Sequence, residues 1–408
     1  MKKSKILKIF AVGLLALSAV SFVGCGHKHS YSNRTIEPTS TGNGYTLHSC
    51  SCGKKYKDEY TCLLSFESMT EDSGLDNSLL PIVTQYVVPI DTNFAGVEDT
   101  ANFQVCEYRV YSQDNDYQIL YKGQNIKNSM NISIVWKEKT EATEEEIEFD
   151  ELLSKIKKLE EISEQYNADK KSTKNAQLRA MQYIRQTRYN TGPWNYLAGS
   201  LESDFAQYVA NNQGDMDLTT LQSYANFTIP KTNEEVDFVH MISVMNVACN
   251  VGVKSYAFVD LPGWLGDIIQ LAGQIKKLGL TKTEAVQKCI ELFGAIEGSS
   301  FGLYDLIADL DAINIMQVYE NLEEKSISSI MEQYYNSINT DRRKSDFIET
   351  VFDGQVSKEE MIASTNSRLK SSIYMLVWCQ TENIDTSAEY DKAIVDKLIE
   401  LFIDYILA

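Results

Sequence analysis

Proline and histidine are scarce in this 408-residue chain, and both are unevenly placed. Only six prolines occur, and none follows Pro262. Because proline breaks helix interiors, its absence from the remaining chain permits uninterrupted helices there. Three of the four histidines fall before residue 49, so His240 is the only histidine in the rest of the chain. The chain is thus expected to have a turn-rich front part and a helical back part.

Basic charge is also in short supply. The chain holds 38 Lys and Arg against 57 Asp and Glu, for a formal net charge of -19. Four of the lysines lie within the first eight residues, and without them the formal charge changes from -19 to -23. A chain this acidic repels phosphates and anionic headgroups, so we exclude nucleic acid as a partner.

Specific catalytic signatures are missing as well. The sequence contains no glycine-rich phosphate loop, no dinucleotide fingerprint and no His-Glu-x-x-His motif. Beyond the first 25 residues it has no apolar run of about 18 residues, the length of a membrane-spanning helix. Any functional site must therefore be sought among individual side chains.

The first 25 residues have the three parts of a secretory signal. The lysines precede an apolar run from Ile9 to Val23, which is short for a membrane span, and Gly24 and Cys25 follow. With Cys25 placed directly after Phe22-Val23-Gly24, the stretch resembles a bacterial lipoprotein signal. That resemblance implies removal of residues 1–24, acylation of Cys25 by palmitate or a similar chain, and anchoring at the outer face of the cell membrane. An ordinary cleaved signal or an uncleaved anchor is the alternative.

Residues 25–62 are predicted to form a small module rich in cysteine and histidine. Its motifs are spaced like those of a module repeated in many Gram-positive surface proteins, with Ser40 where the first cysteine is usual. The motifs are His29-Ser30-Tyr31, Pro38-Thr39, Gly44-Tyr45-Thr46, Cys50-Ser51-Cys52-Gly53 and Tyr60-Thr61.

Four side chains of this module are candidate metal ligands: His27, His29, Cys50 and Cys52, with His48 nearby as a further donor. Imidazole nitrogen and thiolate sulfur are the ligands of tetrahedral zinc sites. A piece this small has little core and benefits from a metal or disulfide. Structural zinc, a disulfide at Cys50 or Cys52, and neither of these remain open.

Residues 63–138 predict a β-rich module, and residues 139–171 an acidic linker running into a helix. Segments rich in β-branched and aromatic residues alternate with polar turns, which favours a small sandwich acting as a spacer or binding module. The predicted strands cover 63–66, 82–88, 103–110, 117–121 and 130–136.

Residues 172–408 predict a large all-α domain. Four start signals pair a hydroxyl with a glutamate three residues later, the pattern of a helix capping box. They are Thr232-x-x-Glu235, Thr281-x-x-Glu284, Ser357-x-x-Glu360 and Thr386-x-x-Glu389. The fold class is therefore multidomain: a small Cys/His module and a small β module, followed by this all-α domain.

Four ionisable side chains of the helical domain are the candidate catalytic residues: His240, Asp267, Asp305 and Asp309. Asp305 and Asp309 lie one helical turn apart on the same face. Asp267 falls on the helix side that should be buried. Because buried carboxylates are costly unless they are paired, protonated or bound to a cation, several of them suggest a shared polar site. For His240, on an apolar helix, the alternative is a hydrogen-bonded core residue.

Two chemistries fit these residues. A pair of carboxyl groups could serve as general acid and base in glycoside cleavage. Alternatively, the histidine and the aspartates could hold a divalent metal for hydrolysis. The candidate substrate-binding residues are Arg188, Tyr189, Trp194 and Trp264, whose rings could stack on sugars.

The sequence favours an extracytoplasmic lipoprotein that hydrolyses cell-envelope glycan or peptidoglycan through its helical domain. The competing hypothesis is a non-enzymatic surface protein for binding or adhesion. A hydrolase requires the four candidate residues to converge on one cleft, whereas a binding protein does not.

Overall fold

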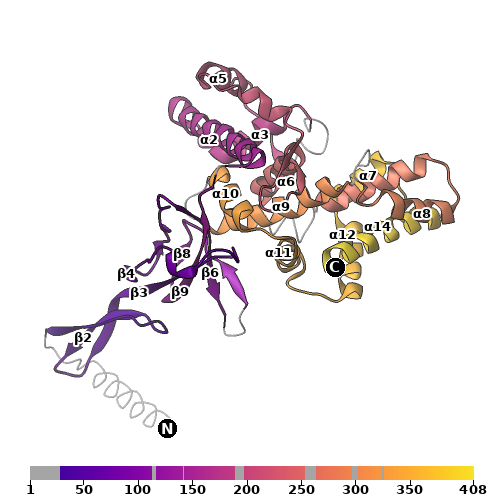
Figure 1. The fold of residues 1–408 in the computed structure, drawn as a ribbon. Coiled ribbons are helices and arrows are strands. Elements are labelled where there is room, and N and C mark those ends of the chain that lie inside the picture. The colour runs from indigo at the N-terminus through magenta and orange to yellow at the C-terminus, as the bar shows by residue number, and fades with distance from the viewer. Residues whose placement is uncertain are drawn as a thin grey trace, which may run out of the picture. The chain divides into compact units, whose positions relative to one another are not determined.

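A computed structural model describes residues 28–112, 116–140, 142–188, 197–252, 263–295, 302–322 and 326–408. Strands between 31 and 138 precede helices between 144 and 407 (Figure 1), which confirms the predicted order of a Cys/His module, a β module and an all-α domain. The chain divides into two compact units. The first contains the described residues up to Phe66 with 84–92 and 126–131, and the second contains 67–83, 93–125 and 132–408.

The first unit is built from antiparallel strands. β2 (Gly44–Cys50) pairs with β1 (Tyr31–Ile36) on one side and with β3 (Lys55–Met69) on the other, and β3 also pairs with β4 (Tyr86–Pro89). β3 runs without a break through position 62, where the sequence analysis ended the first module.

Little apolar surface is buried in the first unit. Cys62 and Leu64 are almost fully buried, and Cys50 is 6% exposed. Asn43 adds a polar connection, because its Oδ1 accepts hydrogen bonds from the Ser129 backbone (2.9 Å) and from the Cys62 thiol (3.6 Å). The unit is therefore held mainly by backbone pairing.

Three strands between residues 103 and 138 lie in one sheet. β6 (Phe103–Tyr111) pairs antiparallel with β9 (Met130–Glu138) and with β7 (Tyr117–Ile119), so the predicted two-layered sandwich is wrong for these strands. The buried Trp136 donates its indole N–H to Ser68 Oγ at 3.0 Å. Shorter elements nearby are the 3-10 helix Asn77–Leu79 and the strands β5 (Thr92–Asn93) and β8 (Asn125–Ile126).

Helices make up most of the second unit. A short hairpin of β10 (Asn226–Thr228) and β11 (Glu235–Asp237) and a 3-10 helix, Leu218–Gln222, interrupt them. The helices are α2 (Glu144–Lys170), α3 (Ala176–Arg185), α5 (Phe205–Asn212), α6 (Phe238–Val251), α7 (Gly263–Lys277), α8 (Lys282–Leu292), α9 (Leu303–Asn321), α10 (Ile327–Ser337), α11 (Thr340–Phe352), α12 (Lys358–Ser371), α13 (Ile373–Thr381) and α14 (Glu389–Leu407).

α6 and α9 form the centre of this unit. Both are buried on nearly every side and pack against each other, and α7 also contacts α9. Figure 1 shows α2, α3 and α5 to one side of this pair and α7, α8 and α14 to the other. Within the described residues, every helix is too short or too polar to cross a bilayer.

The predicted helix starts have mixed outcomes. Thr281 and Glu284 form the reciprocal capping box of α8, as predicted. Ser357 occupies the cap position of α12, but its side chain makes no capping hydrogen bond to the described residues. The box beginning at position 232 is wrong because it lies in the β10–β11 hairpin, and the box at 386 is wrong because α14 is capped by Ala388.

A buried ion pair joins α9 to α11. Asp311 and Arg343 are both fully buried, and Arg343 Nε lies 2.7 Å from Asp311 Oδ1. The Tyr334 hydroxyl donates to the same carboxylate at 2.6 Å. Separating such a pair leaves an uncompensated buried charge, which is strongly destabilising. The pair therefore restricts rotation of α9 about its axis. Asp311 has a structural role.

Candidate functional site

His240 lies in the first turn of α6. Asp237 caps this helix, and its Oδ1 accepts the backbone N–H of His240 at 2.9 Å. The other side chains of α6 from Phe238 to Ala248 are buried as well, and His240 itself is 4% exposed.

Three aspartates approach His240 from two other helices that begin in the same region. Asp305 and Asp309 occupy the first and second turns of α9, and Asp267 the second turn of α7. Asp305 Oδ2 accepts the backbone N–H of Gly302 at 3.2 Å, which satisfies one free donor of the helix terminus. Helix N-termini carry partial positive charge, so this region favours carboxylates.

The imidazole and two of these carboxylates meet in one cluster. His240 Nε2 lies 3.2 Å from Asp309 Oδ1 and 3.4 Å from Asp267 Oδ2. One donor atom from each of the three side chains lies within 4.8 Å of the others. Asp267 is 5% exposed and Asp309 is 1% exposed. The predicted candidates therefore converge, but in a buried cluster with Asp305 beside it.

Two carboxylate oxygens of the cluster are unsatisfied. Asp267 Oδ2 and Asp309 Oδ2 are buried and accept no well-formed hydrogen bond from a described donor. Asp267 Oδ2 lies 3.4 Å from His240 Nε2, and the two carboxyl groups can bond to each other only when one of them is protonated. Burial raises the pKa of Asp267 well above its usual range, His240 opposes this rise, and the carboxyl groups of Asp309 and Asp305 add to it. The cluster is thus arranged to share a proton or to bind a cation.

Asp305 is perturbed in the same direction. Burial raises its pKa from 3.8 to about 6, His240 opposes the rise, and Asp237 and Asp309 add to it. A carboxyl group with a pKa near neutrality can give or accept a proton under ordinary conditions.

Two of the predicted substrate-binding residues, Arg188 and Trp264, lie within the described residues. Trp264 is 1% exposed, and its ring stacks on Phe402 with centroids 4.5 Å apart, so its prediction as a sugar-stacking surface is wrong. The Arg188 guanidinium lies 3.1 Å from Asp237, the cap of the His240 helix. Tyr189 and Trp194 lie outside the described residues.

Asp237 is a supporting residue to which the sequence alone assigned no role. Asp237 caps α6 and also pairs with Arg188. It therefore fixes where α6 begins and, with it, the position of His240. Its signal was present, because an aspartate three residues before His240 has the spacing of a helix cap. The nearby box at position 232 was chosen as the helix start instead.

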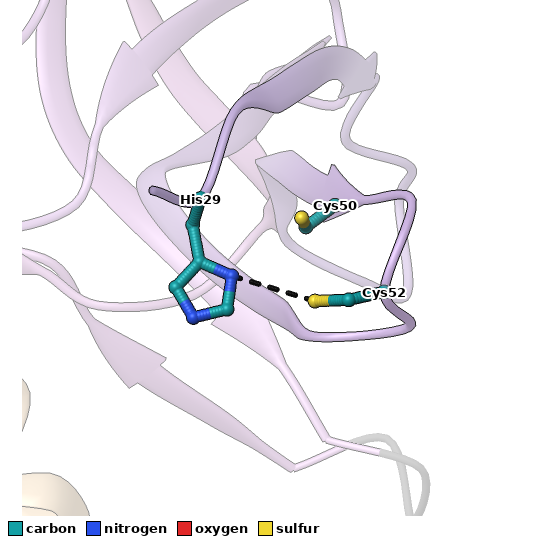
Figure 2. Close-up of side chains that lie close together, drawn as sticks. All are labelled: His29, Cys50 and Cys52. Atoms are coloured by element: carbon teal, nitrogen blue, oxygen red, sulfur yellow. Dashed lines mark hydrogen bonds between the residues drawn. The ribbon is translucent and has the colours of Figure 1, made fainter. Parts of the chain in front are cut away.

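A second cluster lies in the first unit (Figure 2). One donor atom from each of His29, Cys50 and Cys52 lies within 4.8 Å of the other two, so this group has a geometry that could hold a metal ion. Cys52 Sγ lies 3.4 Å from His29 Nδ1. His27, predicted as the fourth ligand, and Cys25 lie outside the described residues.

Strand register and one turn explain this second cluster. Tyr31 of β1 pairs with Cys50 of β2, which places His29 beside the end of β2. The chain then turns through Gly53, whose φ of +91° favours glycine, and the turn brings Cys52 back toward Cys50. Among the described residues, no two cysteines are joined by a disulfide.

His48 belongs to a different set of contacts. Its Nε2 lies 2.6 Å from Asp58 Oδ1, and its ring stacks on Tyr56 with centroids 4.3 Å apart. The histidine that joins the two cysteines is therefore His29, which lies two residues before β1.

Comparison with known proteins gives one match. A family model described as YkzU uncharacterised protein matches residues 237–408. The match begins at the cap of α6 and includes the complete His240, Asp267, Asp305 and Asp309 group, while the second cluster lies outside it. No curated protein and no solved structure matches the chain.

The raised pKa of Asp305 predicts a pH-dependent stability in metal-free protein. The folded chain holds this proton up to a pH of about 6, against 3.8 ordinarily, so stability falls as the pH rises between these values and stays lower above them. Asp305→Asn removes this pH-dependent loss of stability, because asparagine does not titrate. Relative to the parent, the variant should gain about 2–3 kcal/mol of unfolding free energy between pH 4 and pH 7.5, since one pKa unit is worth about 1.4 kcal/mol.

Urea unfolding with EDTA at both pH values measures this effect. An unchanged free-energy difference between variant and parent at the two pH values would contradict the assignment of the raised pKa to Asp305.

Proposed function

We propose that this protein is an extracytoplasmic lipoprotein, anchored to the membrane through Cys25, whose helical domain hydrolyses cell-wall peptidoglycan. The observation that carries the hydrolase proposal is the convergence of His240, Asp267 and Asp309 from three helices. An imidazole in contact with two buried carboxylates is a costly arrangement with no packing advantage, and such perturbed groups concentrate at functional sites.

The geometry favours cleavage of an amide bond over a glycosidic bond. Carboxyl pairs of glycosidases are separated by about 5–5.5 Å or about 6.5–9.5 Å, which leaves room for the sugar or for water. The ligand oxygens of Asp267 and Asp309 lie within 4.8 Å of each other, and Trp264 is buried beneath Phe402. In the proposed reaction, water oxygen bonds to the acyl carbon, the carbon–nitrogen bond breaks, and a proton passes to the leaving amine.

Each residue has a distinct role in this proposal. His240, Asp267 and Asp309 orient and activate the water, because one donor atom from each lies within 4.8 Å of the others. Asp305 is the proposed proton donor to the leaving amine, since it lies one turn before Asp309 on the same face of α9. Asp237 acts through His240 by capping α6, and is a positioning residue.

Hydrolysis of purified peptidoglycan tests the activity. The full chain should release amino groups without releasing reducing sugar ends. Asp309→Asn should lower the rate by at least about 100-fold, the usual contribution of a positioned acid–base group. Glu291→Gln, at an exposed position of α8, should retain the parental rate.

Circular dichroism should show that the Asp309→Asn variant is folded. A rate for this folded variant equal to that of the parent, or no hydrolysis by the parent, would contradict the hydrolase proposal. The second result would favour the non-enzymatic binding alternative.

The membrane anchor is tested separately by Cys25→Ala. Since the cysteine thiol is the proposed acylation site, the variant should not incorporate labelled palmitate in a Gram-positive host, whereas the parent should. Cys249→Ala, a cysteine of the helical domain, is the control that should keep the label. Equal labelling of parent and Cys25→Ala would overturn the anchor.

We further propose that the His29, Cys50 and Cys52 cluster binds a structural zinc ion. Three soft or borderline donors within 4.8 Å match the ligand types of such sites. His27 is the proposed fourth ligand. This unit buries little apolar surface. A bound metal ion would therefore add stability that the small core does not provide.

Elemental analysis tests this zinc site. Cys52→Ser should lower the zinc content of the full chain by one ion and should also make the β1–β2–β3 region more sensitive to protease. His48→Gln is the matched control and should keep the ion, because His48 contacts Asp58 and Tyr56 instead. Unchanged zinc in Cys52→Ser would exclude the site.

A further inference from the structure

We propose that His240, Asp267 and Asp309 form a second metal site, which binds a divalent transition-metal ion and is best suited to Zn²⁺. This inference deepens the proposed hydrolase function and rests on it for its biological purpose, because it names the ion through which the same centre would activate water. The binding site itself is argued from the geometry of the buried side chains.

The first observation is the pair of unsatisfied oxygens. Asp267 Oδ2 and Asp309 Oδ2 accept no well-formed hydrogen bond from a described donor, although both side chains are more than nine-tenths buried. The two carboxyl groups can bond to each other only if one of them keeps a proton, and Asp267 Oδ2 lies 3.4 Å from His240 Nε2. Burying a carboxylate oxygen without a partner is unfavourable. A cation in contact with both oxygens would satisfy them.

Other buried carboxylates of the same unit accept hydrogen bonds or form ion pairs with protein donors. Glu160 accepts the backbone N–H groups of Ile327 (2.6 Å) and Ser328 (3.2 Å) at the start of α10. Asp391 lies 2.6 Å from Lys276 Nζ and accepts the backbone N–H of Asp385 at 2.7 Å. Backbone and lysine donors therefore satisfy these carboxylates, in contrast to Asp267 Oδ2 and Asp309 Oδ2.

The second observation is the charge balance. Some other buried carboxylates also have one unsatisfied oxygen, but Asp311 is paired with Arg343 and Glu107 with Arg109. Among the described residues, no lysine or arginine forms an ion pair with Asp267 or Asp309, and His240 is their one basic neighbour. A single imidazolium can balance only one of two carboxylates, whereas a divalent cation balances both.

The ligand set selects the class of ion. Imidazole nitrogen suits zinc and other transition metals, whereas magnesium and calcium are bound almost entirely by oxygen. One imidazole and two carboxylates make three protein ligands, the number found in catalytic zinc sites, where a remaining position holds water. In the bound state His240 Nε2, which lies 3.2 Å from Asp309 Oδ1, would present its lone pair to the ion.

Metal binding by the full chain tests this inference. Cys50→Ser and Cys52→Ser are introduced together, so that zinc at the first cluster does not contribute. This parent should retain one Zn²⁺ per chain in elemental analysis after dialysis. Asp267→Asn or Asp309→Asn in this parent should weaken Zn²⁺ affinity by more than about 100-fold, because loss of a second-shell partner alone costs about 10–100-fold.

A matched control uses a buried carboxylate at another place. Asp391→Asn removes a carboxylate that is 2% exposed and paired with Lys276, and it should keep the Zn²⁺. Unchanged affinity in a folded Asp309→Asn variant would overturn the metal site. A folded parent carrying Cys50→Ser and Cys52→Ser that binds no Zn²⁺ would overturn it as well.

The test separates this inference from the hydrolase proposal. Zinc lost on Asp309→Asn, with no peptidoglycan hydrolysis by the loaded parent, would keep the metal site and reject the activity. Hydrolysis that persists in protein freed of metal by chelation would keep the activity and reject the metal site, and would indicate that the two carboxyl groups share a proton instead.

Discussion

Burial of negative charge where three helices begin is the constraint on which the helical unit depends. Asp267 and Asp309 are enclosed by apolar helices, and the N-terminal ends of α6, α7 and α9 face the same region. Partial positive charge at these ends lowers the cost of the carboxylates without removing it. His240 offsets part of the remaining cost by its contacts with both carboxylates. In our proposal, a metal ion offsets the rest.

The surrounding packing holds this costly arrangement in place. α9 is buried on nearly all sides, and its Asp311 is tied to Arg343 of α11, so the helix cannot rotate to expose Asp309 without breaking a buried ion pair. On the other side, Asp237 caps α6 and positions His240. α9 thus carries both a structural aspartate, Asp311, and a proposed functional one, Asp309. The first is paired with Arg343, whereas the second contacts His240.

The candidate residues of the cluster could be found from the sequence because their chemistry is conspicuous in an apolar context. His240 is isolated, and Asp305 and Asp309 have helical spacing. The fate of Trp264 could not be found, because Phe402, the ring that covers it, lies far away in the chain. A tryptophan beside a candidate acid has the same local pattern whether its ring faces solvent or the core.

Pairing between distant segments also explains which of the other sequence-based predictions are correct and which are wrong. The capping box at Thr281 is local and was predicted correctly, whereas the box at 232 was overridden by the pairing of β10 with β11. In the first unit, composition indicated a metal site, but only the register of β1 against β2 shows that His29 reaches Cys50 and that His48 contacts Asp58 instead.

The most direct test of the central claim is X-ray absorption at the zinc edge of the full chain carrying Cys50→Ser and Cys52→Ser. Our account predicts a first shell of nitrogen and oxygen at about 2.0–2.2 Å with imidazole scattering and no sulfur at about 2.3 Å. A sulfur shell, or a shell of oxygen alone without imidazole, would show that zinc does not bind at His240, Asp267 and Asp309, and would contradict the account.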